Sequence, residues 1–249
     1  MIIDYPKPEQ EQALRSLWRE AFGDEEAFLD RFYTDGFAPD RCRCACIGDE
    51  LAGALYWFDC SHQGKPLAYL YGVATAKAFR GKGVCRELMQ NTHSLLKQLG
   101  YAGVILVPAE ENLFSMYEKM GYTVCSYIAS LSAVAGEPAA ALRRLDVAEF
   151  CRLRAGMLPV DGVLQEGDGA HFLSTGADFY AGEDFLVTVA REEDFFPELL
   201  GNPTAAPQIL AALGRKTGRF RTPGTEKAFA MFYPLEDLLP PAYFGLAFD

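Results

Sequence analysis

The stretch LAYLYGVATAKAFRGKGVCRELMQNTHSLLKQLG, residues 67–100, decides the fold of this chain. It opens with an apolar run of strand length, residues 67–75, and continues through a tight glycine-bearing loop, residues 79–84. Apolar side chains then recur at helical spacing over residues 83–99, and Gly100 stands where a left-handed residue ends such a helix. The sequence therefore predicts a strand, a loop, and a helix that begins directly behind the loop.

The loop in front of this helix is suited to a diphosphate. The first turn of a helix has amide groups without intrahelical partners and carries the positive end of the helix dipole. Gly81 and Gly83 let the backbone approach a ligand, while Arg80 supplies a planar cationic fork and Lys82 a point charge. For the loop taken alone, the alternative is a turn with solvated basic residues, because short glycine patterns are common.

Two common nucleotide motifs do not fit this loop. A Walker loop needs the pattern G-x-x-x-x-G-K-[ST], which residues 81–84 do not supply. A dinucleotide fingerprint needs a third glycine at position 86, where this chain has Arg86. It also needs an acidic residue about 20 residues further on, near Tyr101, where none stands. The loop therefore points to another kind of phosphate ligand.

Two runs of sequence resemble the acetyl-CoA-binding core of the Gcn5-related N-acetyltransferase (GNAT) superfamily. The first, VATAKAFRGKGVCRELM at residues 73–89, holds the family's loop pattern Q/R-x-x-G-x-G/A, with Cys85 in place of the final glycine or alanine. The second, VILVPAEENLFSMYEKMGY at residues 104–122, holds the pattern N-x-x-x-x-Y-E-K-x-G-Y. The resemblance covers about residues 40–125. It implies an α/β (α+β) fold with a mixed, mostly antiparallel sheet flanked by helices.

The resemblance implies that acetyl-CoA is the co-substrate and that no metal takes part. In the family, the backbone of the strand before the loop, here residues 73–75, pairs with the pantetheine arm and the thioester carbonyl where two central strands diverge. The Asn112 side chain hydrogen-bonds a pantetheine amide. The implied coenzyme-binding residues are Val73, Ala74, Thr75, Arg80, Gly81, Lys82, Gly83, Val84, Cys85 and Asn112.

Tyr117 is the implied general acid toward the coenzyme thiolate. A tyrosine pKa near ~10 lies above the ~8.5 of a thiol, so a phenol can pass its proton to a departing thiolate. The alternative is a core role, because Tyr117 shares one apolar helical stripe with Leu113 and Met120, and aromatic side chains in such stripes are commonly buried. The surrounding motif favours the catalytic interpretation.

The sequence does not identify the general base. Glu110 and Glu111 follow the second diverging strand, and Asp59 and His62 lie near the end of another strand. Each could act through a water molecule, but a place in a solvated loop is the favoured interpretation for each. In tandem members of the resembled family the C-terminal carboxylate serves as base, which makes Asp249 a further candidate.

The N-terminal part predicts two helices and an antiparallel meander. A helix over residues 9–22 ends at Gly23, and Asp24 caps a second helix. In the resembled family this helical pair shapes the acceptor pocket. The strands are predicted at residues 43–47, 51–59, 67–75 and, after the long helix, 104–107. For most of the candidate lining residues a plain core role is favoured; the candidates are Trp18, Phe22, Phe28, Phe32 and Tyr33.

Beyond Gly136 the resemblance fades, although the order of predicted elements echoes the first half. It resembles a degenerate second copy of the fold, as in tandem acetyltransferases of the enhanced-intracellular-survival type. We therefore expect an acetyl-CoA-binding acetyltransferase domain over residues 1–136 and a smaller degenerate acetyltransferase-like domain over residues 137–249, which closes the acceptor pocket or completes the sheet. Its predicted helices lie at residues 145–154, with Asp146 as the cap, and at residues 168–175, and a third helix ends near Leu213. Its predicted strands lie at residues 185–190 and 228–233.

Composition limits the class of protein and its partners. Half of the 249 residues are hydrophobic, enough for a sizeable core, but no segment reaches the ~20 apolar residues of a membrane span. The formal net charge of -11 disfavours nucleic acids and anionic membranes as partners, and it either attracts a cationic amine or only maintains solubility. We expect a cytoplasmic protein. The sequence leaves the oligomeric state, including a homo-oligomer, open.

The seven cysteines are expected to be reduced thiols. Cys42, Cys44 and Cys46 alternate along a predicted strand and would share one face. Zinc sites usually carry C-x-x-C-like pairs, so cysteines on a sheet face are favoured over a metal site.

These features predict an acetyl-CoA-dependent N-acetyltransferase that moves an acetyl group to a primary amine of a small molecule, by direct attack in a ternary complex. One alternative is a non-catalytic coenzyme-A-binding or sensor module, which Cys85 and the unidentified base slightly favour. Another is transfer to a protein or peptide amine, which would need an open groove in place of a pocket.

Overall fold

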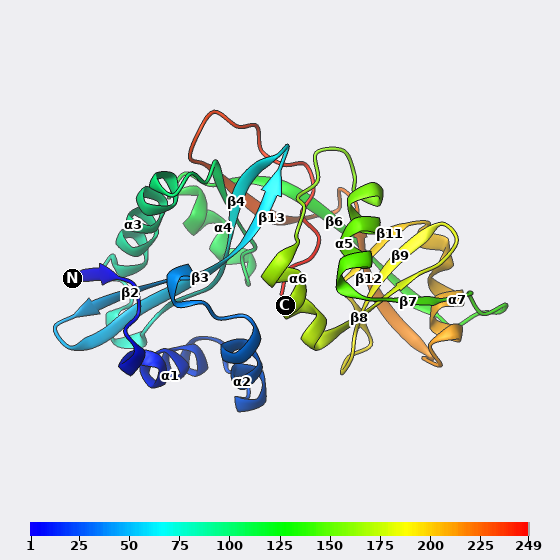
Figure 1. The fold of residues 1–249 in the computed structure, drawn as a ribbon, viewed down its shortest axis with the longest axis horizontal. Coiled ribbons are helices and arrows are strands. Elements are labelled where there is room, and N and C mark those ends of the chain that lie inside the picture. Colours follow the sequence, from blue (N-terminus) through cyan, green and yellow to red (C-terminus); the bar gives the residue numbers. More distant parts are fainter. Residues whose placement is uncertain (249) are drawn as a thin grey trace.

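The computed structural model describes residues 1–248, which form two lobes that share one long sheet (Figure 1). The strands are β1 (Ile2–Asp4), β2 (Cys42–Ile47), β3 (Glu50–His62), β4 (Lys65–Thr75), β5 (Gly103–Leu106), β6 (Thr123–Val134), β7 (Arg143–Leu145), β8 (Ala177–Ala181), β9 (Phe185–Ala190), β10 (Phe195–Phe196), β11 (Glu198–Gly201), β12 (Thr217–Pro223) and β13 (Lys227–Pro234). The helices are α1 (Glu11–Phe22), α2 (Glu26–Asp35), α3 (Val84–Gln98), α4 (Glu111–Glu118), α5 (Val147–Met157), α6 (Gly167–Gly176) and α7 (Ala206–Ala212). In the described residues, one nine-stranded sheet has the order β1-β2-β3-β4-β5-β13-β6-β12-β10, and a four-stranded sheet has the order β11-β9-β8-β7.

The first lobe is a sheet with helices on both faces. α1 and α2 cover one face, where Trp18 and Phe32 join a buried aromatic cluster with Tyr56 of β3. α3 and α4 cover the other face, where Tyr117 belongs to a second buried cluster with Trp57. Successive side chains of a strand point to opposite faces, so β3 is apolar at nearly every position because both of its faces are covered. This is the mixed, mostly antiparallel sheet that the resemblance predicts.

β13 comes from the last part of the sequence, yet it lies between β5 and β6 in the sheet, and Figure 1 shows it near β6. It runs antiparallel to both, with Phe232 opposite Ile105 on one side and opposite Thr123 on the other. Gly103 leaves room for the Phe232 ring, since a Cβ atom at position 103 would lie 2.4 Å from it. The second half of the chain therefore completes the sheet of the first lobe.

A buried polar cluster joins the C-terminal segment that follows β13 to the second lobe. Arg154 of α5 donates hydrogen bonds of 2.7 and 2.9 Å to the Glu198 carboxylate of β11, and the Tyr243 hydroxyl donates another of 2.9 Å. Arg154 and Glu198 are each 1% exposed. Residues 243–248, here called the strap, then cross to the first lobe, where Phe244 packs against an aromatic ring of β4.

Most elements lie where the sequence predicts them, and Asp146 caps α5 as expected. Asp24, in contrast, does not cap α2. The N-cap residue is Glu25, without a side-chain cap bond, and Asp24 instead accepts a hydrogen bond of 2.7 Å from the Trp18 indole. The sequence pattern does not predict β6, β8 or β12. β6 includes the exposed Ser130 and Ser132, and β12 contains Gly218 and two arginines.

None of the described helices is long and apolar enough to cross a membrane. The cysteines are unpaired, and Cys42 and Cys44 lie buried on one face of β2 with their Sγ atoms 4.0 Å apart. Within residues 1–248, no three His, Cys, Asp or Glu side chains are grouped so that they could hold a metal ion.

Candidate active site

β4 and β5 diverge in the middle of the large sheet. The two parallel strands are paired from Leu67 opposite Gly103 to Leu70 opposite Leu106. β5 ends there, while β4 continues to Thr75. On its other edge β5 pairs with β13, so residues 71–75 have no strand neighbour on the β5 side. An extended ligand can add to such an edge as a further strand.

β4 contains a bulge immediately before the predicted coenzyme-binding segment. Ala54 of β3 lies opposite Ala74, but Tyr56 lies opposite Tyr71, so β4 has one residue more than β3 over this stretch. Gly72 adopts a left-handed conformation with a φ of +59°. The sequence offered a signal for this bulge, because an isolated glycine inside a strand pattern often marks one.

The start of α3 has the geometry expected of an anion site. Gly81 and Gly83 have φ values of +75° and +82°, in the left-handed region that favours glycine. The first backbone hydrogen bond of α3 runs from the Glu87 amide to the Gly83 carbonyl oxygen, at 3.1 Å. The amides that precede Glu87 are therefore not used by the helix itself, and residues 80–83 are exposed.

Arg80 connects this loop to the end of β4. Its Nε donates a hydrogen bond of 3.1 Å to the carbonyl oxygen of Thr75. Lys82 lies on the same loop, with Nζ 5.3 Å from the centre of the Phe79 ring. The cationic loop and the open strand edge are thus held next to each other, as a ligand with a diphosphate at one end and an extended arm at the other would require.

Tyr117 is buried on α4, 6% exposed, with its ring 5.6 Å from the Tyr122 ring. Burial is the main cause that raises the pKa of the Tyr117 phenol above its ordinary value, and the neighbouring Cys85 thiol adds to the effect. The phenol therefore stays protonated at neutral pH, which a general acid requires. Burial also raises the pKa of the Cys85 thiol, so this side chain is neutral under the same conditions.

The structure brings part of the predicted site together. Tyr117, Cys85 and Val73 pack around the same buried cluster, which joins α4, the start of α3 and the end of β4. Asn112 lies exposed in the first turn of α4, and within residues 1–248 no hydrogen bond joins its side chain to the other predicted residues. The roles of these residues toward a coenzyme stay predictions.

Two of the candidate general bases have well-defined surroundings. Asp59 accepts hydrogen bonds from the Tyr101 hydroxyl and from the Arg41 guanidinium, which also pairs with Asp168 of α6. This network bridges the two lobes and favours a structural role for Asp59. His62 is 1% exposed, and neither of its ring nitrogens has a partner within the described residues.

The other candidate bases lie at a helix start and at the chain end. Glu110 is the N-cap residue of α4 and Glu111 is in its first turn, and both are exposed. Of the side-chain candidates, these two lie on the element that carries Tyr117. Asp249 lies outside the described residues.

The predicted acceptor-lining rings belong to an aromatic cluster that both lobes build. Trp18 lies 4.7 Å from Phe32 between ring centres. From the second half, Phe172 of α6 and Phe248 of the strap pack on Phe58 of β3 at 5.6 and 4.8 Å. The sequence pattern misses Phe172 and Phe248 because both lie where the resemblance is weak. The other predicted residues lie at the edge of the cluster, partly or largely exposed: Phe22, Phe28 and Tyr33.

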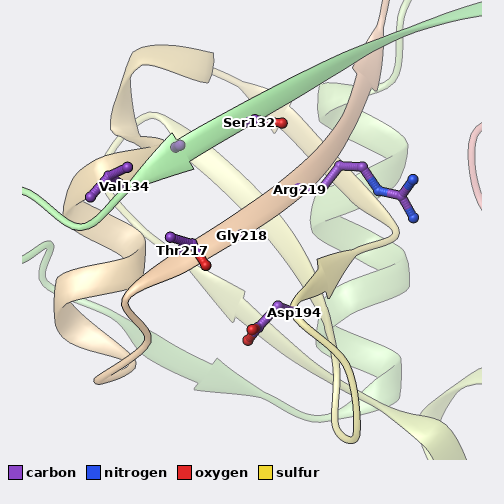
Figure 2. Close-up of a pocket in the computed structure, with 7 residues that line it drawn as sticks. Ser132, Val134, Asp194, Thr217, Gly218 and Arg219 are labelled. Atoms are coloured by element: carbon purple, nitrogen blue, oxygen red, sulfur yellow. The ribbon is translucent and has the colours of Figure 1, made fainter.

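A separate hollow of about 370 Å³ lies on the second lobe, at the far ends of β6 and β12 (Figure 2). It is lined by Ser132 and Val134 of β6, by Thr217 and Arg219 of β12, and by Asp194. None of the predicted site residues borders it. Its position on the outer part of the shared sheet separates it from the divergence of β4 and β5.

Residues 3–125 match the family profile described as "Acetyltransferase (GNAT) domain". No curated protein sequence matches the chain. The matched region contains the diverging strands, the cationic loop and most of α1–α4 and β1–β5, so it includes Tyr117 and every predicted coenzyme-binding residue.

Solved structures share the fold of the whole chain. A GCN5-related N-acetyltransferase from Kribbella flavida matches with a TM-score of 0.71 at 17% identity, over 94% of this chain and 70% of that one. A putative acetyltransferase from Pyrococcus horikoshii matches with a TM-score of 0.69 at 14% identity, over 98% of this chain and 91% of that one. Eis1 from Mycobacterium abscessus matches with a TM-score of 0.70 at 10% identity, over 95% of this chain and 74% of that one. At these identities the likeness is one of fold, and it extends over both lobes.

Proposed function

Since residues 3–125 of this chain form a GNAT acetyltransferase domain, we propose that the protein transfers the acetyl group of acetyl-CoA to a primary amine of a small molecule, by direct attack in a ternary complex. The observation that carries the proposal is the open edge of β4 beside the bare amides at the start of α3. A coenzyme with a diphosphate and an extended amide-bearing arm has the shape and chemistry to use both.

Each part of the site has a task in this reaction. The amides of residues 81–86, with Arg80 and Lys82, hold the diphosphate, and Asn112 and the backbone of residues 73–75 hold the pantetheine arm and the thioester carbonyl. The amine nitrogen attacks the carbonyl carbon, so that a C–N bond forms as the C–S bond breaks. Tyr117 gives its proton to the departing thiolate, and the proton lost by the amine leaves through a base or water.

The surroundings of the site support a small acceptor. Phe172 and Phe248 from the second half lie against the face of β3 and β4 that α1 and α2 also cover, so this side is walled by both lobes. A protein or peptide acceptor would need an open groove there. The net charge of -11 is compatible with a cationic amine.

An assay of thiol release tests the proposal directly. Purified protein is incubated with acetyl-CoA and a panel of polyamines, aminoglycosides, amino acids and peptides, and coenzyme binding is measured alongside by calorimetry. We expect saturable thiol release with at least one small amine. Tight coenzyme binding without turnover on any amine would instead indicate a sensor module, and turnover confined to peptides would indicate a protein acetyltransferase.

Replacing Tyr117 by Phe tests the assignment of the general acid. Because the variant keeps the ring and loses only the proton donor, we expect kcat to fall by about 10²-fold with little change in the dissociation constant of acetyl-CoA. Tyr122→Phe is the matched control, since Tyr122 is also buried nearby and its hydroxyl forms a hydrogen bond with His93. An unchanged kcat for Tyr117→Phe from pH 6 to pH 9 would remove Tyr117 from the mechanism.

A further inference from the structure

Gly72 is in direct contact with the ring of Trp18. A Cβ atom at position 72 would lie 2.5 and 2.8 Å from two carbons of the six-membered indole ring and 3.0 Å from the Tyr56 ring. Gly72 also has a φ of +59°, which an L side chain rarely adopts. The bulge in β4 is therefore packed against Trp18 with no space for any residue larger than glycine.

The bulge decides which way the following residues of β4 face. Before it, Tyr69 and Tyr71 point to the side of α1 and α2. In a regular strand Val73 would point the same way. Because the bulge inserts one residue, Val73 packs on the α3 side and Ala74 on the α1 side.

The same inserted residue determines which backbone groups reach the open edge of β4. The N–H and C=O of one strand residue point to one edge, and those of the next residue point to the other. Without the bulge, the amides and carbonyls of residues 73–75 would exchange edges. The segment that faces the divergence from β5 would then present different groups to a ligand.

Trp18 is itself held in place from two sides. Its indole N–H donates a hydrogen bond of 2.7 Å to the Asp24 carboxylate, in the turn between α1 and α2. Its ring lies 5.3 Å from Tyr56 and 5.4 Å from Tyr71 between centres, and the side chain is 3% exposed. The ring that touches Gly72 is thus fixed both by packing and by one directed polar contact.

We propose that Trp18, oriented by Asp24, is a positioning residue for acyl transfer: its contact with Gly72 holds the β4 bulge and so presents the backbone of residues 73–75 to the thioester arm. This inference rests on the proposed function. It assigns to Trp18 an effect on the coenzyme arm, in place of the acceptor-lining role that the sequence predicts for it.

The test uses the full chain with Trp18→Phe, which lacks the carbons nearest Gly72, and with Asp24→Ala, which removes the hydrogen-bond acceptor. Asp24→Asn retains an acceptor oxygen and should behave like the wild type. Leu29→Ala is the control for damage to the same cluster, because Leu29 is fully buried there on α2.

Binding is measured with coenzyme A and with 3′-phospho-ADP, which has the diphosphate but no pantetheine arm. For Trp18→Phe and Asp24→Ala we expect the dissociation constant of coenzyme A to rise roughly tenfold while that of 3′-phospho-ADP is unchanged, since only the arm reaches β4. We expect kcat to fall by roughly 10²-fold, the effect of a misplacement of about 1 Å. Leu29→Ala should leave the ratio of the two dissociation constants at its wild-type value.

A second measurement does not depend on activity. Amide hydrogen exchange at residues 72–75 should be faster in Trp18→Phe and Asp24→Ala than in the wild type and Leu29→Ala, because the bulge is less restrained. In addition, Trp18→Phe should offset part of the damage caused by Gly72→Ala, since it frees space for the added methyl group. The loss of kcat in the double variant should therefore be smaller than the product of the two single losses.

The inference would be overturned if Trp18→Phe and Asp24→Ala kept the amide exchange rates, the coenzyme A affinity and the kcat of the wild type. A change confined to the KM of the amine would overturn it as well and return Trp18 to the acceptor wall. If the wild type neither binds coenzyme A nor releases thiol, the proposed function fails, whereas the exchange experiment still reports whether Trp18 holds the bulge.

Discussion

At the scale of single residues, His93 shows how burial sets a pH dependence. It lies on α3, 7% exposed, with Nε2 2.7 Å from the Tyr122 hydroxyl oxygen and its ring stacked on Tyr233 of β13. Loss of solvent lowers the pKa of His93 to about 4. The ordinary value is about 6.5, so as the pH falls the unfolded chain takes up this proton first. Stability is therefore lost between about pH 6.5 and pH 4.

Replacing His93 by Gln should remove this pH dependence, because glutamine can still bond the Tyr122 hydroxyl but does not titrate. Between pH 7 and pH 5 we expect the unfolding free energy of the wild type to fall by on the order of 1–2 kcal/mol more than that of the variant. Urea unfolding at the two pH values measures the difference. His171→Gln, at an exposed histidine, should follow the wild type. If the unfolding free energy of the wild type and of His93→Gln fell by the same amount between pH 7 and pH 5, this explanation would be contradicted.

Residues defined by a local motif could be placed from the sequence, and those defined by distant contacts could not. Gly83 at the start of α3 and Tyr117 on α4 lie where the motifs predict, because the motif and the turn it describes are contiguous. Asp24 stands at the sequence position of a helix cap, but packing brings Trp18 close to it, and the Trp18 indole N–H donates a hydrogen bond to the Asp24 carboxylate. Gly72 carried the signal of a bulge, yet its contact with Trp18 depends on how α1 docks on the sheet.

At the scale of elements, the loop before α3 should bind phosphate through both its amides and Arg80. We expect Arg80→Ala to weaken coenzyme binding by roughly 10–100-fold, because hydrogen bonds to charged groups contribute about 1.5–3 kcal/mol. The bond from Arg80 to Thr75 would be lost as well. Calorimetry with coenzyme A measures the change. Lys97→Ala, at the opposite end of α3, removes an equal charge and should leave the affinity for coenzyme A unaltered. If Lys97→Ala weakened coenzyme binding as much as Arg80→Ala, the effect would come from the overall charge of the protein and not from a local contact.

Four elements of the first lobe, β2, β3, β4 and α3, follow from local patterns because each is long or strongly apolar. The meander of β2, β3 and β4 and the helix α3 lie close to their predicted bounds. The order of the sheet is a different matter, since hydrophobic periodicity does not say which strands are neighbours. The apolar run at residues 228–233 predicts a strand, but only the structure shows that this strand pairs with β5 and β6.

At the scale of the whole molecule, the first lobe depends on the second half of the chain. Without β13, both β5 and β6 would have an open edge, and the buried side chains of Met231 and Phe232 would leave the core. We therefore expect a fragment of residues 1–136 to show no cooperative thermal unfolding by circular dichroism. Co-expression with residues 137–249 should recover a soluble complex. A fragment that melts like the full chain would show that the lobe is self-sufficient.

The place of β13 also has a consequence for synthesis in the cell. β5 and β6 leave the ribosome long before residues 227–234 do, so the nascent protein carries a gap in the middle of its sheet for much of translation. Unpaired strand edges invite pairing with other chains, and pairing between distant segments is slow. We expect the yield of folded protein to depend on slow elongation, low temperature and chaperones that shield this gap until the last strand arrives.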